Sequence, residues 1–214
     1  MPSDDGKTEA NPIELGLDIQ PWRSIPPPHP GGSPRRCGGR PAAGPPSTNP
    51  DAMNYEEDAV YDDGSCIVPD IIVPDDYSTI EEAFNNIALD GDVIYVRAGT
   101  YTSFEWSSDA DIKLIGEDRE TTIIDGDQKG TVVKFHRYHN HNKTVLSGFT
   151  ITNGKGTVDE GGPWGGGIEI NGAANPLLRD LIIENNTALN GAGINLYGSA
   201  SPNIENCIIR NNQA

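Results

Sequence analysis

The carboxyl-terminal two-thirds of the chain is predicted to form an all-β solenoid, a parallel β-helix. First, GGGIEINGAANPLLRDLIIENN begins at Gly165 and GAGINLYGSASPNIENCIIRNN begins at Gly191, so nearly the same phrase recurs after 26 residues without a gap. Second, the apolar residues alternate in short bursts, which is the period of a strand with one buried face. Third, Gly, Asn and Pro interrupt the bursts and favour bends. This fixed period indicates coils that stack in parallel, one coil per repeat.

A looser copy of the phrase precedes these two. LSGFTITNG aligns Leu146 with Leu178, a shift of 32 residues, and the surplus lies in the glycine-rich stretch GKGTVDEGGPWGGG. We expect this surplus to leave the coil as a protruding loop, because insertions in a solenoid map to loops. We expect Ile183 and Ile209 to lie over each other inside one apolar column.

Polar residues also recur at the repeat period. The outward position of Glu184 is followed one coil later by Arg210, and pairs of opposite sign are favoured across neighbouring strands. A second polar set lies at a repeated bend and is expected to point inward, where stacked asparagine side chains hydrogen-bond to one another as a ladder. This structural set is Asn153, Asn185 and Asn211.

The segment before the first coil has the pattern of a short helix. Ser78 and Glu81 match the S-x-x-E capping box, and Gly91 is expected to end the helix. The apolar face of this helix should cover the open first coil, because uncovered strand edges invite aggregation. The residues of that face are Ile80, Ala83, Phe84 and Ile87.

From Val73 to Ala214 the chain resembles the right-handed parallel β-helix proteins of the pectin-lyase-like superfamily. The phrases that carry the resemblance are VPDDYSTIEEAFNNIALDGDVIYVRAGTY, IKLIGEDRETTIIDG, GFTITNG and NPLLRDLIIENN. The resemblance implies a right-handed, single-stranded β-helix with a short capping helix over residues 70–214. It implies little about chemistry, since similar phrases occur in lyases, hydrolases, adhesins and uncharacterised surface proteins.

Composition limits the partners. The chain has 214 residues, 35% apolar content and a formal net charge of −17, which disfavours nucleic acid because its phosphate backbone is itself anionic. No segment has the length and apolar character of a membrane span, so we expect no membrane insertion. We expect a monomer.

The amino-terminal part has a different character. Residues 1–47 are proline-rich, lack the apolar stretch of a signal peptide and are predicted to be disordered. Residues 48–69 form an acidic segment, and TNPDAMNYEEDAVYDDGSC resembles a short repeat of bacterial secreted and surface proteins that begins "GC-T" and closes "DDGSC". Here Ser47 stands at the first cysteine position, so Cys66 has no local mate.

Two expectations follow from that mismatch and from the repeat pattern. We interpret residues 1–47 as not native to this architecture, with a genuine disordered arm and a degenerate module as the alternative. At the other end the repeat breaks off at Ala214, where a further strand would begin, so we expect the β-helix to be truncated there. The resemblance of residues 48–69 implies that the protein is secreted or displayed on the cell surface.

Candidate metal ligands lie outside the repeats. The acidic residues Asp58, Asp62 and Asp63 supply the oxygen ligands that calcium prefers, but they lack the D-x-D-x-D-G spacing, so an acidic turn is the alternative. HRYHNHN brings three histidines close together, and we interpret this stretch as a solvated loop rather than a zinc site. No other cofactor is predicted.

The outward positions contain no predicted catalytic residues. Polysaccharide lyases of this fold resemble one another in placing calcium-binding acids beside a basic residue, and glycoside hydrolases use grouped aspartates. Here Glu169 stacks with Asn195, and neither this row nor the Glu184 row sets an aspartate cluster beside an unpaired arginine. Asp109, Asp111 and Lys113 form the nearest catalytic pattern, which reads more simply as an acidic loop that enters a strand.

The glycine-rich insertion is the better candidate for binding. Trp164 offers an aromatic plane between glycines, and Asp159 and Glu160 lie near it in sequence, a combination that suits stacking against a sugar ring. The alternative is a tryptophan folded back over the coil. Trp106 is a second, weaker aromatic candidate.

These observations predict a secreted or surface-displayed β-helix module. It is predicted to be non-catalytic in this stretch and to support recognition of a polysaccharide, a cell-surface glycan or another surface. One alternative is the front part of a polysaccharide lyase or glycoside hydrolase whose active groups lie in coils beyond Ala214. The other is a structural spacer of a large adhesin.

Overall fold

A computed structural model describes most of the chain from Ile67 onward. The described residues are 53, 67–86, 89–106, 110–135, 142–159 and 162–214. The predicted arm 1–47 and the calcium candidates Asp58, Asp62 and Asp63 lie outside these residues, as do Asp109, Glu160 and the three histidines.

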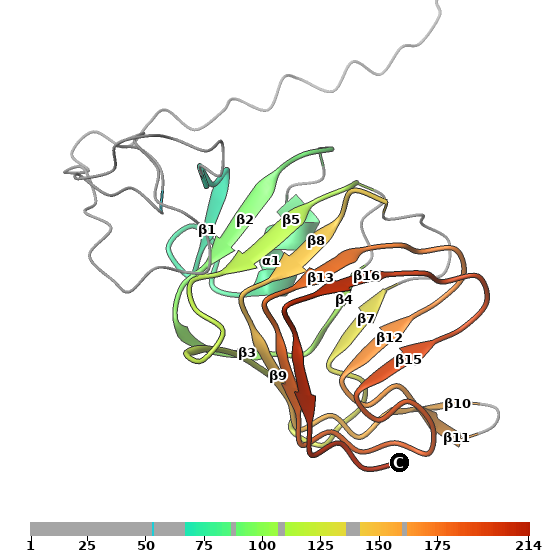
Figure 1. Cartoon of the computed structure of the whole chain (residues 1–214). Helices are drawn as coiled ribbons and strands as arrows, with labels where there is room; N and C mark the ends of the chain where they lie inside the picture. Colours follow the sequence, from blue (N-terminus) through green and yellow to red (C-terminus); the bar gives the residue numbers. More distant parts are fainter. Residues whose placement is uncertain (1–52, 54–66, 87–88, 107–109, 136–141, 160–161) are drawn as a thin grey trace, which may run out of the picture. The chain divides into compact units, whose positions relative to one another are not determined.

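Three parallel sheets run along the solenoid, and each coil contributes one strand to a sheet in turn (Figure 1). The first sheet comprises β1 (Ile71–Val73), β2 (Val93–Val96), β5 (Lys113–Gly116), β8 (Val145–Ser147), β13 (Leu177–Arg179) and β16 (Asn203–Glu205). The second comprises β3 (Gly99–Thr102), β6 (Thr122–Asp125), β9 (Thr150–Thr152), β14 (Ile182–Glu184) and β17 (Ile208–Arg210). The third comprises β4 (Phe104–Trp106), β7 (Val133–Phe135), β12 (Ile168–Ile170) and β15 (Ile194–Leu196).

The register confirms the predicted parallel β-helix. Ile183 pairs with Ile209 above it and with Ile151 below it, so these side chains form one inward column. On the outside, Arg179 Nη2 lies 2.8 Å from a Glu205 carboxylate oxygen, and Arg210 Nε lies 2.6 Å from Glu184. The predicted pair of Glu184 and Arg210 therefore forms between successive coils, and Arg179 and Glu205 form a second pair of the same kind.

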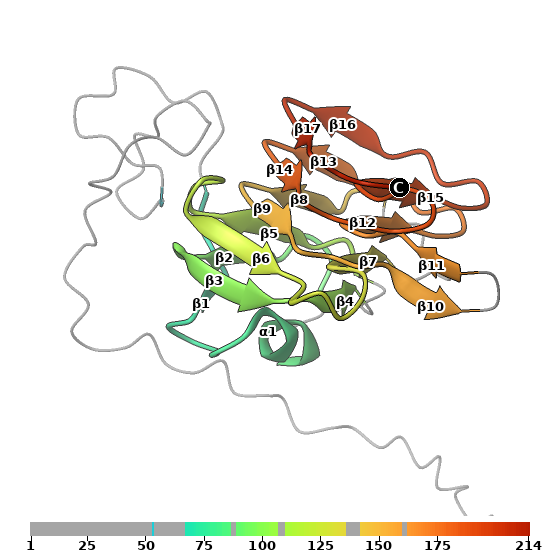
Figure 2. The ribbon, with the colours of Figure 1, turned by 90° about the horizontal axis from the view of Figure 1, so that it is seen from below.

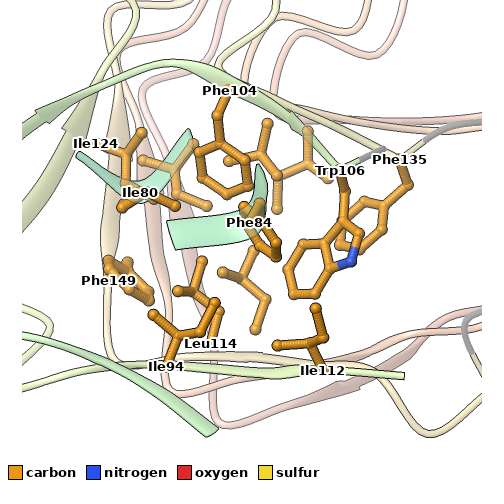
Figure 3. Packing of buried hydrophobic residues seen from close by; sticks show 14 of the residues in the cluster. Ile80, Phe84, Ile94, Phe104, Trp106, Ile112, Leu114, Ile124, Phe135 and Phe149 are labelled. Carbon is orange, nitrogen blue, oxygen red and sulfur yellow. The ribbon is translucent and has the colours of Figure 1, made fainter. Parts of the chain in front are cut away.

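One short helix, α1 (Ile80–Asn86), covers the first coil, as expected (Figure 2). Its Phe84 ring lies 5.4 Å from the ring of Phe104 and 4.8 Å from that of Trp106 (Figure 3). The Trp106 ring stacks in turn on Phe135 at 5.0 Å. Trp106 is fully buried in this cluster, so the prediction that it could bind a sugar is wrong.

The cap of this helix is shifted by one residue from its predicted place. The helix begins at Ile80, so Thr79 is the cap residue, and its hydroxyl accepts a hydrogen bond from the Glu82 N–H at 3.1 Å. Glu82 in return accepts from the Ser78 N–H and hydroxyl at 3.1 and 2.6 Å. Glu81 is exposed on the helix surface.

The predicted asparagine ladder is also wrong by one residue. Asn153, Asn185 and Asn211 occupy the bend with φ of 58°, 57° and 55°, and this left-handed backbone turns the side chain away from the core. Asn185 and Asn211 are exposed, and Asn153 donates to Asp125 at 3.0 Å.

The inward ladder is formed by the next residue in each coil. Asn186 is fully buried and donates through Nδ2 to Asn212 Oδ1 at 3.0 Å and to the Ile151 carbonyl at 3.1 Å. Its Oδ1 accepts from the Gly154 N–H at 2.8 Å. In the coil below, a backbone N–H therefore takes the place of an asparagine side chain in the ladder. Among the described residues, no helix combines the length and the hydropathy required to cross a bilayer.

Candidate functional site

The glycine-rich insertion folds as a β-hairpin that leaves the third coil between β9 and β12. Its strands, β10 (Thr157–Asp159) and β11 (Gly162–Trp164), pair antiparallel, with Thr157 opposite Trp164. Figure 2 shows this hairpin projecting sideways from the stacked coils. The predicted protruding loop is therefore confirmed, and it has secondary structure of its own.

Glycines at the base of the hairpin allow its strands to leave the coil. Gly165 adopts φ of 53°, a conformation that residues with side chains rarely take. A Cβ on Gly154 would collide with the Gly166 carbonyl oxygen, so the two ends of the insertion approach closely. The glycines thus fix the place where the hairpin joins the solenoid.

The three predicted binding residues are distributed along this hairpin. Trp164 ends β11, is partly exposed and forms a parallel bridge with Asn190 of the next coil. Asp159 ends β10 opposite Gly162. Trp164 therefore lies beside the third sheet, and the candidate binding site is on the outer face of this sheet.

A polar row runs along that outer face at the central position of its four strands. Glu105 of β4 pairs with Lys134 of β7, Lys134 pairs with Glu169 of β12, and Glu169 pairs with Asn195 of β15. Neighbouring strands are about 4.8 Å apart, so acidic and basic groups alternate on adjacent coils. Among the described residues, none forms an ion pair with Lys134.

Alignment of the internal repeats identified only two members of this row, Glu169 and Asn195. Glu169 and Asn195 are 26 residues apart and share the repeated phrase, whereas Lys134 precedes Glu169 by 35 residues and follows Glu105 by 29. Because the coil lengths differ, no fixed offset aligns these residues. A local pattern could have identified Glu105 and Lys134 as outward residues. The tripeptides FEW and VKF each place one charged residue between two inward apolar residues.

Glu169 is the unusual member of the row because its outward side chain is only 5% exposed. The Gly165 backbone lies over it, and a Cβ on Gly165 would approach the Glu169 Cβ to 2.8 Å. One carboxylate oxygen accepts from Asn171 Nδ2 at 2.5 Å, and the other lies 3.4 Å from the Thr131 hydroxyl. The strand geometry presents this carboxylate to the outside, and the hairpin base covers it.

The hydroxyls beside Glu169 connect the hairpin to the second coil. Thr131 Oγ1 lies 2.8 Å from Thr157 Oγ1 on β10 and 3.4 Å from the Trp164 carbonyl oxygen on β11. Both hairpin strands therefore meet the same hydroxyl. The arrangement places the partly exposed residue Trp164 at the edge of the sheet that carries the row of hydrogen-bonding and charged groups.

The other catalytic pattern from the sequence has a structural role. The Asp111 carboxylate accepts from the Lys143 N–H at 3.1 Å and from the Thr144 hydroxyl at 3.3 Å, and it thereby joins two coils. Lys113 is exposed on the first sheet, away from the row around Glu169. No group of three His, Cys, Asp or Glu side chains suited to a metal lies within the described part of the chain.

Burial shifts the pKa values of two acidic groups, Asp92 and Cys207, that lie outside this row. Burial raises the pKa of the Asp92 carboxyl, and nearby Asp70 contributes to the same shift. Burial also raises the pKa of the Cys207 thiol, which is free, half-buried in the last described coil and packed against the core. Neither group is positioned to take part in chemistry at the hairpin.

Comparison with known proteins agrees with the geometry. The family described as "Right handed beta helix region" matches residues 80–214. The chain belongs to this family. No curated protein and no solved structure matches the sequence. Membership of the right-handed beta helix family accounts for the architecture, whereas the function of such a protein depends on its individual surface sites.

Proposed function

We propose that this right-handed beta helix protein is a secreted or cell-surface module that recognises a carbohydrate, without catalysing a reaction on it. The binding face comprises Trp164 on the hairpin and the partly exposed members of the neighbouring row, Lys134 and Asn195. The protein acts as a monomer with a polysaccharide or cell-surface glycan as its partner. Export is supported by the resemblance of residues 48–69 to a repeat of secreted proteins.

The observation that carries this proposal is the position of Trp164. The indole of Trp164, a partly exposed residue at the end of β11, offers an apolar plane to the C–H face of a sugar. The polar row next to it offers donors and acceptors for the hydroxyl groups of the same sugar. Carbohydrate sites need this combination of one aromatic plane and a few directed polar groups.

Affinity electrophoresis tests the proposal directly. The protein is run in native gels that contain pectate, alginate, xylan or other soluble glycans, and at least one glycan is expected to retard it. Trp164→Ala should abolish most of that retardation, whereas Tyr197→Ala, which removes an exposed aromatic ring from a loop outside the hairpin, should not. Equal mobility of the wild type and Trp164→Ala in every gel would exclude stacking on Trp164.

The row Glu105, Lys134 and Glu169 favours a second candidate function, a polysaccharide lyase or glycoside hydrolase. It sets acids on either side of a base on adjacent coils, which is the kind of arrangement the sequence had not revealed. A lyase would generate unsaturated products that absorb in the ultraviolet, and a hydrolase would generate reducing ends. Sustained turnover that Lys134→Met removes would establish the enzyme and refute the non-catalytic proposal.

Localisation has its own test. Antibodies against the purified chain should detect the protein in the culture medium or on intact cells of the source organism. Detection only after cell lysis would exclude export. A protein that is exported but retarded by no glycan would instead fit a structural spacer.

A further inference from the structure

We propose that the base of the hairpin is a calcium site. The ligands are the Glu169 carboxylate, the Thr131 and Thr157 hydroxyls and the main-chain carbonyl of Trp164. The site is distinct from the acidic segment of residues 48–69. It does not depend on the proposed function, because it is defined by the metal alone.

The first argument is that three other oxygen atoms surround the Thr131 hydroxyl. Thr131 Oγ1 lies 2.8 Å from Thr157 Oγ1 and 3.4 Å from both the Trp164 carbonyl oxygen and Glu169 Oε2. Oxygens that share one calcium ion lie about 3 Å apart, because each is about 2.4 Å from the metal. The observed spacings match that arrangement.

The second argument is a count of protons. A hydroxyl has one hydrogen to donate, so Thr131 can satisfy only one of its three oxygen neighbours. Thr157 has one further proton, and the two hydroxyls are already close enough to use one of these two protons between them. The remaining proton serves one more acceptor, and the Trp164 carbonyl has a backbone donor as well, because it faces the Thr157 N–H across the hairpin ladder. A cation would coordinate the lone pairs of these four oxygens that the available protons do not reach.

The third argument is the buried charge. Glu169 is 5% exposed, and its short hydrogen bond is to the neutral amide of Asn171 at 2.5 Å. Lys134 is next to it in register, yet no ion pair joins these two described residues. A buried carboxylate is costly unless a cation or several donors compensate it.

The chemistry of the ligands selects the metal. All four are oxygens, with no nitrogen or sulfur, which favours a hard cation, and the mixture of carboxylate, hydroxyl and carbonyl suits the flexible coordination of calcium, with water completing the shell. One carboxylate in the set places the expected dissociation constant at about 10⁻⁴–10⁻³ M, the range of extracellular modules. The ion would tie both hairpin strands to the second and third coils.

Calcium binding is measured by isothermal titration with calcium chloride, using the full chain with Asp58, Asp62 and Asp63 changed to Asn so that the acidic segment does not contribute. The terbium ion is a second probe, because excitation of Trp164, whose carbonyl is a ligand, should sensitise its luminescence. We expect one bound ion per chain. Glu169→Gln should weaken binding at least about tenfold, and Thr131→Val should weaken it while leaving the circular dichroism of the protein unchanged.

The matched control is Glu184→Gln, which removes the same charge from an outward position of the second sheet. It should bind calcium as the parent does. Absence of binding at millimolar calcium would overturn the proposal, and so would unchanged binding in Glu169→Gln. Equal weakening by Glu184→Gln would also overturn it, since it would show only diffuse attraction to an acidic surface.

Discussion

Asn185 and Asn186 carry the same side chain but lie in opposite surroundings. Asn185 takes the left-handed conformation that turns the chain, and its side chain is exposed. Asn186 is fully buried, and its amide joins three coils through Ile151, Gly154 and Asn212. Asn185 therefore forms the bend of the backbone, and Asn186 supplies hydrogen bonds to polar groups in the interior.

Substitution separates these two roles. Asn186→Leu should lower the free energy of unfolding by about 2–4 kcal/mol, because the Gly154 N–H and the Ile151 carbonyl lose their partner in the interior. Asn185→Gly should change it by no more than about 1 kcal/mol, because glycine adopts the same bend readily. Urea titration followed by circular dichroism measures both. Equal losses in the two variants would contradict the assignment of Asn186 to the ladder.

Cys207 gives a prediction about pH. Burial raises the pKa of its thiol, so the folded state holds this proton more tightly than the unfolded state does. The associated stability is present below the ordinary thiol pKa and is lost as the pH rises through the raised value.

In a chain with Cys37→Ser and Cys66→Ser, the rate of alkylation by iodoacetamide should rise at a higher pH for the folded protein than for the protein in urea. Superimposable pH profiles for the folded and unfolded protein would show that the thiol is not shielded.

At the scale of elements, α1 and the hairpin differ in their relation to the core. The helix places Phe84 against Phe104 and Trp106 and closes the first coil. The hairpin contributes ligands and an aromatic ring to an outer face but leaves the column of Ile151 and Ile183 intact. We therefore expect the helix to be needed for folding and the hairpin to be needed for recognition.

The helix prediction concerns packing. Phe84→Ala should destabilise the protein by about 3–5 kcal/mol, the usual cost of removing a buried aromatic ring. Glu81→Ala, on the exposed side of the same helix, should alter stability by no more than about 0.5 kcal/mol. Thermal and urea unfolding give both values. A small effect of Phe84→Ala would mean that the helix does not seal the first coil.

The hairpin prediction concerns function. Deletion of residues 158–163 removes six residues and restores the 26-residue spacing of the later coils. The shortened chain should keep its β-rich circular dichroism and a stability within about 1 kcal/mol of the parent, since loop length has a small entropic effect. It should no longer be retarded by glycans. Loss of folding would instead assign the hairpin a structural role.

At the scale of the whole molecule, stability should vary along the solenoid axis. Ile183 and Ile209 occupy equivalent positions in one column, yet Ile183 is 0% exposed and Ile209 is 50% exposed. Ile183→Ala should lower the free energy of unfolding by about 2–5 kcal/mol, and Ile209→Ala by less than about 2 kcal/mol. Urea unfolding of the two variants compares them, and equal effects would contradict this gradient.

The sequence was informative where the repeat was regular. The 26-residue offset placed Ile183 under Ile209 and Glu184 beside Arg210, and the structure confirms both pairs. The sequence could not decide which asparagine of each Asn-Asn pair points inward. Either residue can occupy a bend, and only the backbone conformation determines which side chain turns toward the core.

The candidate site was less predictable. Lys134 and Glu105 lie in coils of different lengths, so no offset aligned them with Glu169. The burial of Glu169 depends on how Gly165 and the hairpin fold over the strand, which alternation of apolar residues cannot reveal. Trp164 was found because an aromatic residue among glycines is conspicuous in an insertion.

The hairpin has one consequence for engineering. Although it interrupts the third coil, β12 still pairs in full register with β7 on one side and β15 on the other. Gly154 and Gly166 hold the two ends of the insertion together. Foreign peptides could therefore be inserted between these two glycines without changing the pairing of the solenoid strands. The protein could then serve as a display scaffold for inserted sequences.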